Sequence, residues 1–137
     1  MSPDPITAIL RDMASNYVPG VCNINPQEIK RRRQSGHIGV AITILLIMLL
    51  ITTGATWYLR IIIIVPAFIA AIGYLQARNK FCVAYASSGQ HHADSGDTVK
   101  ITDKKSLTAD SKKTRTMNLQ ASIIASVVTA IVCVLPT

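Results

Sequence analysis

The sequence predicts an all-α membrane protein with three transmembrane helices and a short N-terminal amphipathic helix. Of its 137 residues, 50% are hydrophobic and only 15% are charged. Three apolar runs begin near Ile38, Ile61 and Leu119, and the charges lie outside them. A bilayer core requires about 20 apolar residues per helix. We therefore expect a single membrane domain, divided into an N-terminal segment 1–36, a first span 38–59, a second span 61–77, a polar loop 78–118 and a third span 119–135.

The amphipathic helix is predicted between Asp4 and Tyr17. Asp4 is a suitable N-cap, Pro5 suits the first helical position, and apolar residues follow at helical spacing. Such a helix could lie in the membrane interface or on a partner, or it could cover loops of its own chain, and both options stay open. The first thirty residues contain no continuous apolar core, so we expect the first span to act as its own insertion signal.

The first span belongs to a helix predicted from Pro26 to about Thr53. Asn25 is its expected cap and Glu28 its capping-box carboxylate. A basic cluster occupies its first third, and two further cations follow the second span. This basic set consists of Lys30, Arg31, Arg32, Arg33, Arg78 and Lys80. It could be a topology anchor or a site for anionic lipid headgroups, because both depend on the same electrostatics.

Small residues follow one side of each of the other two spans and predict close helix packing. In the second span they are Ala67, Ala70, Gly73 and Ala77. In the third span they are Ser122, Ser126, Thr129 or Ala130, and Cys133. Trp57, Tyr58 and Arg60 suit the far membrane interface. The second helix could continue through Tyr85.

The loop between the second and third spans is polar. Residues 87–97 read as an irregular loop, and residues 103–118 as either a solvated helix or a mobile segment. Arg60 is the one basic residue between the first two spans, and all other Lys and Arg residues fall on the opposite side. The positive-inside rule therefore places the N-terminus and this loop in the cytoplasm and the C-terminus outside.

Few residues suggest chemistry. The predicted spans contain no Asp, Glu or Lys, which argues against an ion or proton path in this chain alone. Cys22, Cys82, His91 and His92 would share one side of the membrane, but their spacing is poor for a metal or redox site. We expect no cofactor, no metal and no catalytic residue. The net charge is +7, but the charged residues flank the apolar segments, as in a membrane protein, and only 5% of residues are aromatic. We therefore do not expect nucleic acid as a partner.

Two blocks of the sequence stand out. The first comprises Cys22-Asn23-Ile24, Glu28-Ile29, Arg31-Arg32-Arg33 and Gly36, and the second Pro66, Gly73, Gln76-Ala77-Arg78 and Phe81-Cys82. Together they resemble a family of small, uncharacterised bacterial membrane proteins. The resemblance covers about Cys22 to Tyr85 and implies a three-span protein of the bacterial inner membrane, without an activity. Where the family implies an Asn-Phe-Gly-like stretch, this chain has His91-His92-Ala93. We expect the two blocks to pack together, with Glu28 or Asn23 near Arg78 and Cys22 near Cys82.

These features favour a non-catalytic accessory subunit of a larger membrane complex of respiratory, photosynthetic or monooxygenase type. Its partners would be the membrane, other membrane-protein subunits and anionic lipids. Two alternatives stay open. One is a self-assembling protein that forms a holin-like or pore-like oligomer. The other is a thiol- or metal-handling protein that uses Cys22 and Cys82.

Overall fold

A computed structural model describes residues 5–6, 17–92 and 98–136 of the chain. Three helices are long and apolar enough to cross a membrane: Pro26–Thr52, Trp57–Asn79 and Lys104–Val134. The chain divides into two compact units. We call residues 1–30 and 76–115 the polar unit, and residues 31–75 and 116–137 the apolar unit. The predicted amphipathic helix from Asp4 to Tyr17 falls almost wholly outside the described residues.

Helix α2 (Pro26–Thr52) confirms the long helix predicted from the sequence. The Asn25 side chain accepts a hydrogen bond from the Glu28 backbone amide at 3.0 Å, which is the expected cap. The second helical segment consists of α3 (Trp57–Arg60), a 3-10 turn η1 (Ile61–Ile63) and α4 (Ile64–Asn79). Pro66 has no amide hydrogen to bond back to Ile62, and this loss accounts for the tighter turn just before α4.

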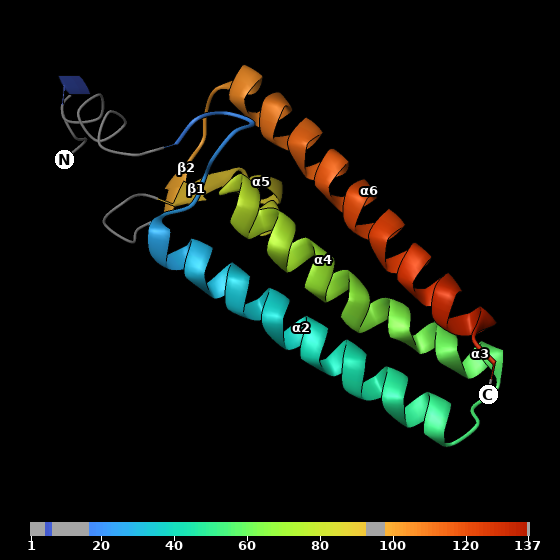
Figure 1. The fold of residues 1–137 in the computed structure, drawn as a ribbon. Helices are drawn as coiled ribbons and strands as arrows, with labels where there is room; N and C mark the ends of the chain where they lie inside the picture. The colour runs from blue at the N-terminus through green and yellow to red at the C-terminus, as the bar shows by residue number, and fades with distance from the viewer. Residues whose placement is uncertain (1–4, 7–16, 93–97, 137) are drawn as a thin grey trace. The chain divides into compact units, whose positions relative to one another are not determined.

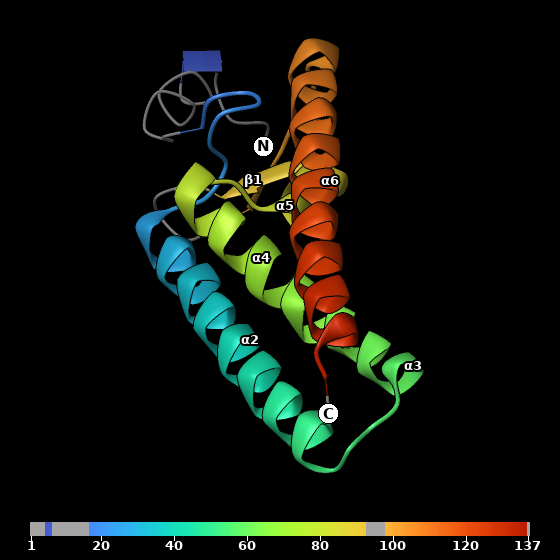
Figure 2. The same ribbon diagram turned by 45° about the vertical axis from the view of Figure 1, so that its right-hand side comes forward.

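Helices α2 and α4 touch backbone to backbone within the apolar unit. A β-carbon at Gly39 would lie 2.6 Å from the Ala70 nitrogen, and one at Gly73 would lie 2.7 Å from the Gly36 nitrogen. Both distances are too short for any side chain, so glycine is required at these crossings. The two helices lie side by side in both ribbon views (Figures 1 and 2).

Helix α6 (Lys104–Val134) completes the apolar unit with its C-terminal part. Its buried face carries Met117, Ala121, Ala125, Thr129 and Val132. The hydrophobic core forms where the C-terminal half of this face of α6 packs on α4 and on the 3-10 turn before it. Partly buried residues of α2 pack against this core. The core residues are Ile63, Ala67, Ala125 and Val132, with Leu46, Ile47, Leu50, Phe68 and Val128 around them.

Arg60 fastens the end of α6 in the apolar unit. Its side chain is 3% exposed, and it donates hydrogen bonds to the carbonyls of Val132 at 3.0 Å and Leu135 at 2.7 Å. A third bond reaches the Ala55 carbonyl at 3.0 Å. The last carbonyls of a helix have no partner within the helix, and a cation there also complements the helix dipole. Arg60 is therefore a buried cap of α6. Its position at the far membrane interface stays a prediction.

The polar unit contains the remaining elements. Helix α4 ends at Asn79 and does not continue through Tyr85, because Lys80 adopts a left-handed backbone conformation with φ of 52°. A short helix α5 (Val83–Ser87) follows, and then an antiparallel pair of strands, β1 (Gln90–His92) and β2 (Thr98–Lys100). Strand β1 lies in the predicted irregular loop 87–97 and β2 begins directly after it, so the protein is mostly but not wholly helical.

Residues 104–118 are helical and belong to α6. Asp103 accepts hydrogen bonds from the backbone amide of Ser106 at 3.2 Å and from its hydroxyl at 2.9 Å, which caps the start of α6. These bonds lower the pKa of the Asp103 carboxyl. Of the two options left open by the sequence, the helix is confirmed.

We predict that Gly39→Leu weakens the apolar unit, because the new side chain would collide with the backbone at Ala70. The expected loss is about 3 kcal/mol, the upper range for overpacking a tight interior. The matched control is Ala41→Leu, which enlarges an exposed position of the same helix. Unfolding by SDS in detergent micelles, followed through the single tryptophan Trp57, reports the difference. Equal midpoints for the two variants would contradict the close crossing.

Candidate functional site

The polar unit is organised around the point where α4 ends. The Phe81 amide donates to the Gln76 carbonyl at 3.0 Å, and the Lys80 amide to the Ala77 carbonyl at 3.4 Å. This is the Schellman pattern of a helix C-terminus, with Lys80 in the position that usually holds glycine. The Gln76 side chain then accepts a hydrogen bond from the Val83 amide at 3.1 Å. The turn after α4 is thus held by its own backbone and by one side-chain amide.

Asn23 joins the N-terminal segment to this turn. Its side chain is 1% exposed, accepts from the Cys82 amide at 2.6 Å and donates to the Cys82 carbonyl at 3.1 Å. Its own backbone amide donates to the Lys80 carbonyl at 3.1 Å. A buried amide needs partners for both its oxygen and its nitrogen, and Cys82 supplies both. The Asn23 block and the Cys82 block therefore meet, as expected, through the bonds of Asn23 with Cys82 and Lys80. The expected approaches of Glu28 or Asn23 to Arg78, and of Cys22 to Cys82, stay predictions.

A second buried group, Asp110 of α6, holds the residues before Asn23. Its carboxylate is 0% exposed and accepts from the Tyr17 hydroxyl at 2.9 Å and from the Gly20 amide at 2.7 Å. Gly20 has φ of 68°, which favours glycine, in the tight turn from Val18 to Cys22. The Tyr17 ring stacks on buried His91 with ring centroids 4.2 Å apart. These contacts connect the start of the described N-terminal segment to α6 and to β1.

The environment of Tyr17 favours its protonated form. Burial, followed by the hydrogen bond to Asp110 and the negative charge of that carboxylate, raises the pKa of the Tyr17 hydroxyl well above its ordinary value of about 10. A tyrosinate next to a buried carboxylate would combine two like charges in one place. The hydroxyl therefore acts as a hydrogen-bond donor in this network.

The predicted thiol and metal set consists of Cys22, Cys82, His91 and His92, and the structure describes different surroundings for its members. Cys82 is buried with its backbone bound by Asn23, Cys22 is half-buried, and His91 stacks on Tyr17. The side chain of His92 lies outside what the structure describes. Among the described residues, no three His, Cys, Asp or Glu side chains lie close enough to hold a metal ion. The described geometry assigns Cys82 a place in the packing of the turn.

The basic set lies at the surface of both units. Lys30, Arg78 and Lys80 are exposed in the polar unit, and Arg31 and Arg33 are exposed in the apolar unit, with Arg32 half-buried. Exposed cations suit either an anchor or a headgroup contact, so both interpretations made from the sequence remain open.

The two predicted stripes of small residues differ in burial. On α4, Ala67, Ala70, Gly73 and Ala77 are buried, and Ala70 and Gly73 form the close crossing with α2. On α6, the buried face is offset by one residue from the predicted stripe. Ser122, Ser126 and Ala130 are therefore exposed, while Ala121, Ala125 and Thr129 face the core.

No protein family profile matches this chain, and neither a curated protein nor a solved structure matches it. The structure supports the coarse part of the resemblance drawn from the sequence, namely three long apolar helices. Membership of that family stays an expectation.

Sequence reasoning missed Asp110 and Tyr17 as partners. Asp110 lies in a stretch rich in Lys, Ser and Thr, and no local pattern distinguishes it from a solvated acid. One signal was present. Asp110 is three residues before Lys113, which bonds Asn79 at 2.9 Å, and seven before buried Met117, so it shares the inward face of α6.

We predict that Tyr17→Phe changes how stability depends on pH. The pKa of Tyr17 is higher in the folded than in the unfolded protein, so its protonated form stabilises the fold. This contribution to the free energy of unfolding is fully present below about pH 10 and is lost as the pH rises from there toward the folded-state pKa. At pH 8 the variant should lose about 1 kcal/mol with the hydrogen bond to Asp110. Between pH 8 and pH 11 the wild type should lose more stability than the Tyr17→Phe variant, so the difference in stability between the two proteins should become smaller. Thermal unfolding followed by circular dichroism measures both proteins, and a constant gap would exclude the role given to Tyr17.

Proposed function

We propose that the chain is a non-catalytic accessory subunit of a larger membrane protein complex. The observation that carries this proposal is the exposed stripe of Ser122, Ser126 and Ala130 on α6. Small residues four apart allow a second helix to approach closely in a membrane, where packing replaces the hydrophobic effect as the driving force. The equivalent stripe on α4 is already occupied within the chain.

The two serine hydroxyls strengthen this proposal. In the described part of the chain, neither Ser122 nor Ser126 makes a hydrogen bond, whereas the buried Thr43 and Thr129 bond to the carbonyls four residues before them at 2.7 and 2.8 Å. A hydroxyl in hydrocarbon gains from any partner, and serine bonds between helices contribute about 0.6 kcal/mol each on average. A neighbouring subunit could supply those partners.

The amount of apolar surface also favours neighbours. Only 17% of the most apolar window of the first span is buried within the chain, and the third span reaches 28%. Lipid covers such surface as well as protein does, so this surface permits lateral partners and does not by itself require them.

The proposal includes a location and an orientation. The resemblance drawn from the sequence favours the bacterial inner membrane. The distribution of Lys and Arg supports an orientation with the N-terminus and the polar unit in the cytoplasm and the C-terminus outside. In that orientation the basic set, which includes Lys30, Arg33 and Arg78, would meet the anionic cytoplasmic leaflet, where each charge near the surface contributes about 1 kcal/mol. The parent complex would supply any reaction.

We predict that the protein extracted from native membranes in mild detergent migrates with other chains, and that Ser122→Leu/Ser126→Leu releases it. Two bulky side chains would prevent close approach along the exposed stripe. The matched control, Ile123→Leu/Val127→Leu, changes exposed positions next to the stripe without adding bulk at it. Blue native electrophoresis with mass spectrometry of the migrating species identifies the chains.

Three outcomes separate the possibilities. Release by the serine pair alone supports an accessory subunit. A ladder that contains only this chain supports the self-assembling alternative. Migration of the wild type as a free monomer would rule out both.

A further inference from the structure

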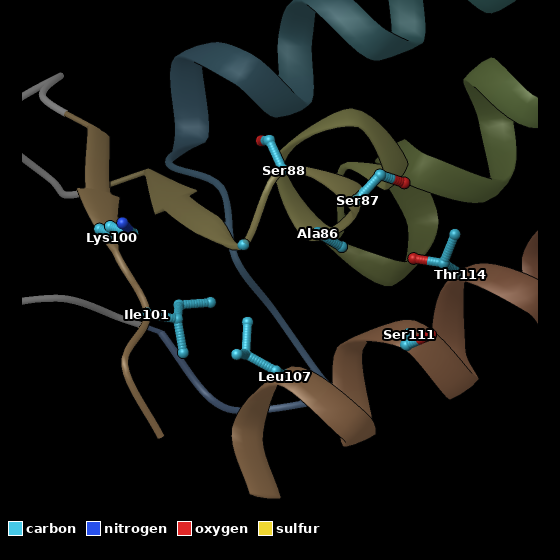
Figure 3. Close-up of a pocket in the computed structure, with 9 residues that line it drawn as sticks. Ala86, Ser87, Ser88, Lys100, Ile101, Leu107, Ser111 and Thr114 are labelled. Carbon is cyan, nitrogen blue, oxygen red and sulfur yellow. The ribbon is translucent and has the colours of Figure 1, made fainter. Parts of the chain in front are cut away.

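Part of the side chain of Thr114, and part of that of Arg60, has no hydrogen-bond partner among the described residues, and the two differ in their access to a ligand. Thr114 of α6 lines a cavity of about 430 Å³ in the polar unit (Figure 3), but its hydroxyl oxygen is shielded from solvent. No ligand reaches that atom, so this hydroxyl does not mark a binding site. Arg60 of α3 lies in the apolar unit, and its contacts leave one nitrogen open.

The guanidinium of Arg60 uses three of its five N–H donors within the chain. Nε donates to the Ala55 carbonyl at 3.0 Å, and Nη1 donates to the carbonyls of Val132 at 3.0 Å and Leu135 at 2.7 Å. The two N–H groups of Nη2 bond no atom of the described residues. Nη2 is also not among the shielded nitrogens that lack a partner, so it reaches the surface of the apolar unit, although the whole side chain is only 3% exposed.

The charge of Arg60 is only partly balanced by its surroundings. Its three partners are neutral carbonyls, and the C-terminal end of the α6 dipole supplies about half a negative charge. The residues of the apolar unit, 31–75 and 116–137, contain no Asp or Glu. A cation within a membrane span is costly without an accompanying anion, and such residues commonly mark a functional contact. An anion from outside the unit would complete the balance.

The neighbours of Arg60 along the chain indicate which anion is at hand. Trp57 and Tyr58 precede it in α3 and are exposed, and Trp and Tyr are typical of the layer where lipid headgroups meet the hydrocarbon. Ile61 and Ile62 follow it and expose apolar side chains, which suit acyl chains. Every phospholipid carries a phosphate at that depth, and arginine binds phosphate through charge-assisted hydrogen bonds.

We propose that Nη2 of Arg60 binds the phosphate of a phospholipid at the end of the apolar unit where α6 terminates. The bond holds one lipid beside α3, while Nε and Nη1 keep the end of α6 capped. This contact rests on the predicted position of Arg60 at the far membrane interface. It uses none of the basic set from Lys30 to Lys80 and needs no partner subunit, so it is independent of the proposed accessory role.

Two variants that conserve charge provide the test. Arg60→Lys keeps three donors for the three carbonyls and loses the two that would bind phosphate, whereas the matched control Arg33→Lys changes an exposed cation of the same unit. The full-length proteins are released from detergent micelles that contain phosphatidylglycerol, and native mass spectrometry measures the retained lipid. Arg60→Lys should weaken retention of the most tightly held lipid by about tenfold, because a charge-assisted bond is lost. Arg33→Lys should change it less than about twofold, because lysine keeps the charge at the surface.

A measurement on the wild type covers the case in which Arg60→Lys loosens the end of α6. Solid-state NMR of protein with isotope-labelled arginine, in phosphatidylglycerol bilayers, detects lipid phosphorus close to each guanidinium carbon. The Arg60 signal is the one that Arg60→Lys removes, and we expect the phosphorus to dephase it. Equal retention by the two variants together with an Arg60 signal that is not dephased would overturn the proposal, and a carboxylate of a neighbouring chain would then be the remaining candidate.

Inorganic phosphate distinguishes the source of the ligand. Added to the micelles, it should not displace the lipid that depends on Arg60, because the acyl chains of the lipid are held by the apolar surface around α3. Dephasing of the Arg60 signal in bilayers of a phosphorus-free glycolipid with added inorganic phosphate, but not in phosphatidylglycerol, would assign the site to a soluble phosphate and contradict the lipid contact.

Discussion

The fold depends on satisfying backbone polar groups wherever a helix ends or the chain turns. In a bilayer no water reaches such groups, and in a small protein few elements are available to cover them. Arg60 binds the carbonyls of Val132 and Leu135, which lie 72 and 75 residues further along the chain. Asn23 binds both polar groups of Cys82, 59 residues away. Distant side chains thus close the ends that the helices leave open.

These polar contacts explain why each unit is compact despite a small core. In the apolar unit most buried core side chains are small. Seven of the buried positions named above are alanine or glycine, namely Gly36, Gly39, Ala67, Ala70, Gly73, Ala121 and Ala125. Helices approach closely there because little side-chain volume intervenes, and dispersion contacts of the backbone take the place of large apolar groups. In the polar unit, the Gly20 amide bonds to Asp110 and the Asn23 side chain bonds to Cys82. These hydrogen bonds connect the N-terminal segment to α6 and to the turn after α4.

Much of the helical framework could be predicted from the sequence because its signals are local. The Asn25 cap, Pro26 and the apolar run to Thr52 define α2 within one stretch of chain. The remaining features depend on residues far apart. The strands Gln90–His92 and Thr98–Lys100 are three residues each, which is too short for a sequence pattern to predict their pairing. Lys80 carries no sign of its left-handed conformation, and Arg60 looks like any interfacial arginine until α6 is placed beside it. On α6, the residues that are buried lie one position before the predicted stripe of Ser122, Ser126 and Ala130. Successive residues of a helix point about 100° apart, and the apolar pattern of this span did not distinguish two adjacent faces.

The most direct measurement concerns the crossing of the membrane itself. A membrane-impermeant label is applied to intact cells that carry a reactive tag either before Met1 or after Thr137. If the chain crosses the membrane three times and its Lys- and Arg-rich segments lie in the cytoplasm, only the tag after Thr137 is exposed to the label. We therefore expect labelling of that tag alone. Labelling of both tags, or of neither until the cells are opened, would place the two ends on one side and contradict the arrangement.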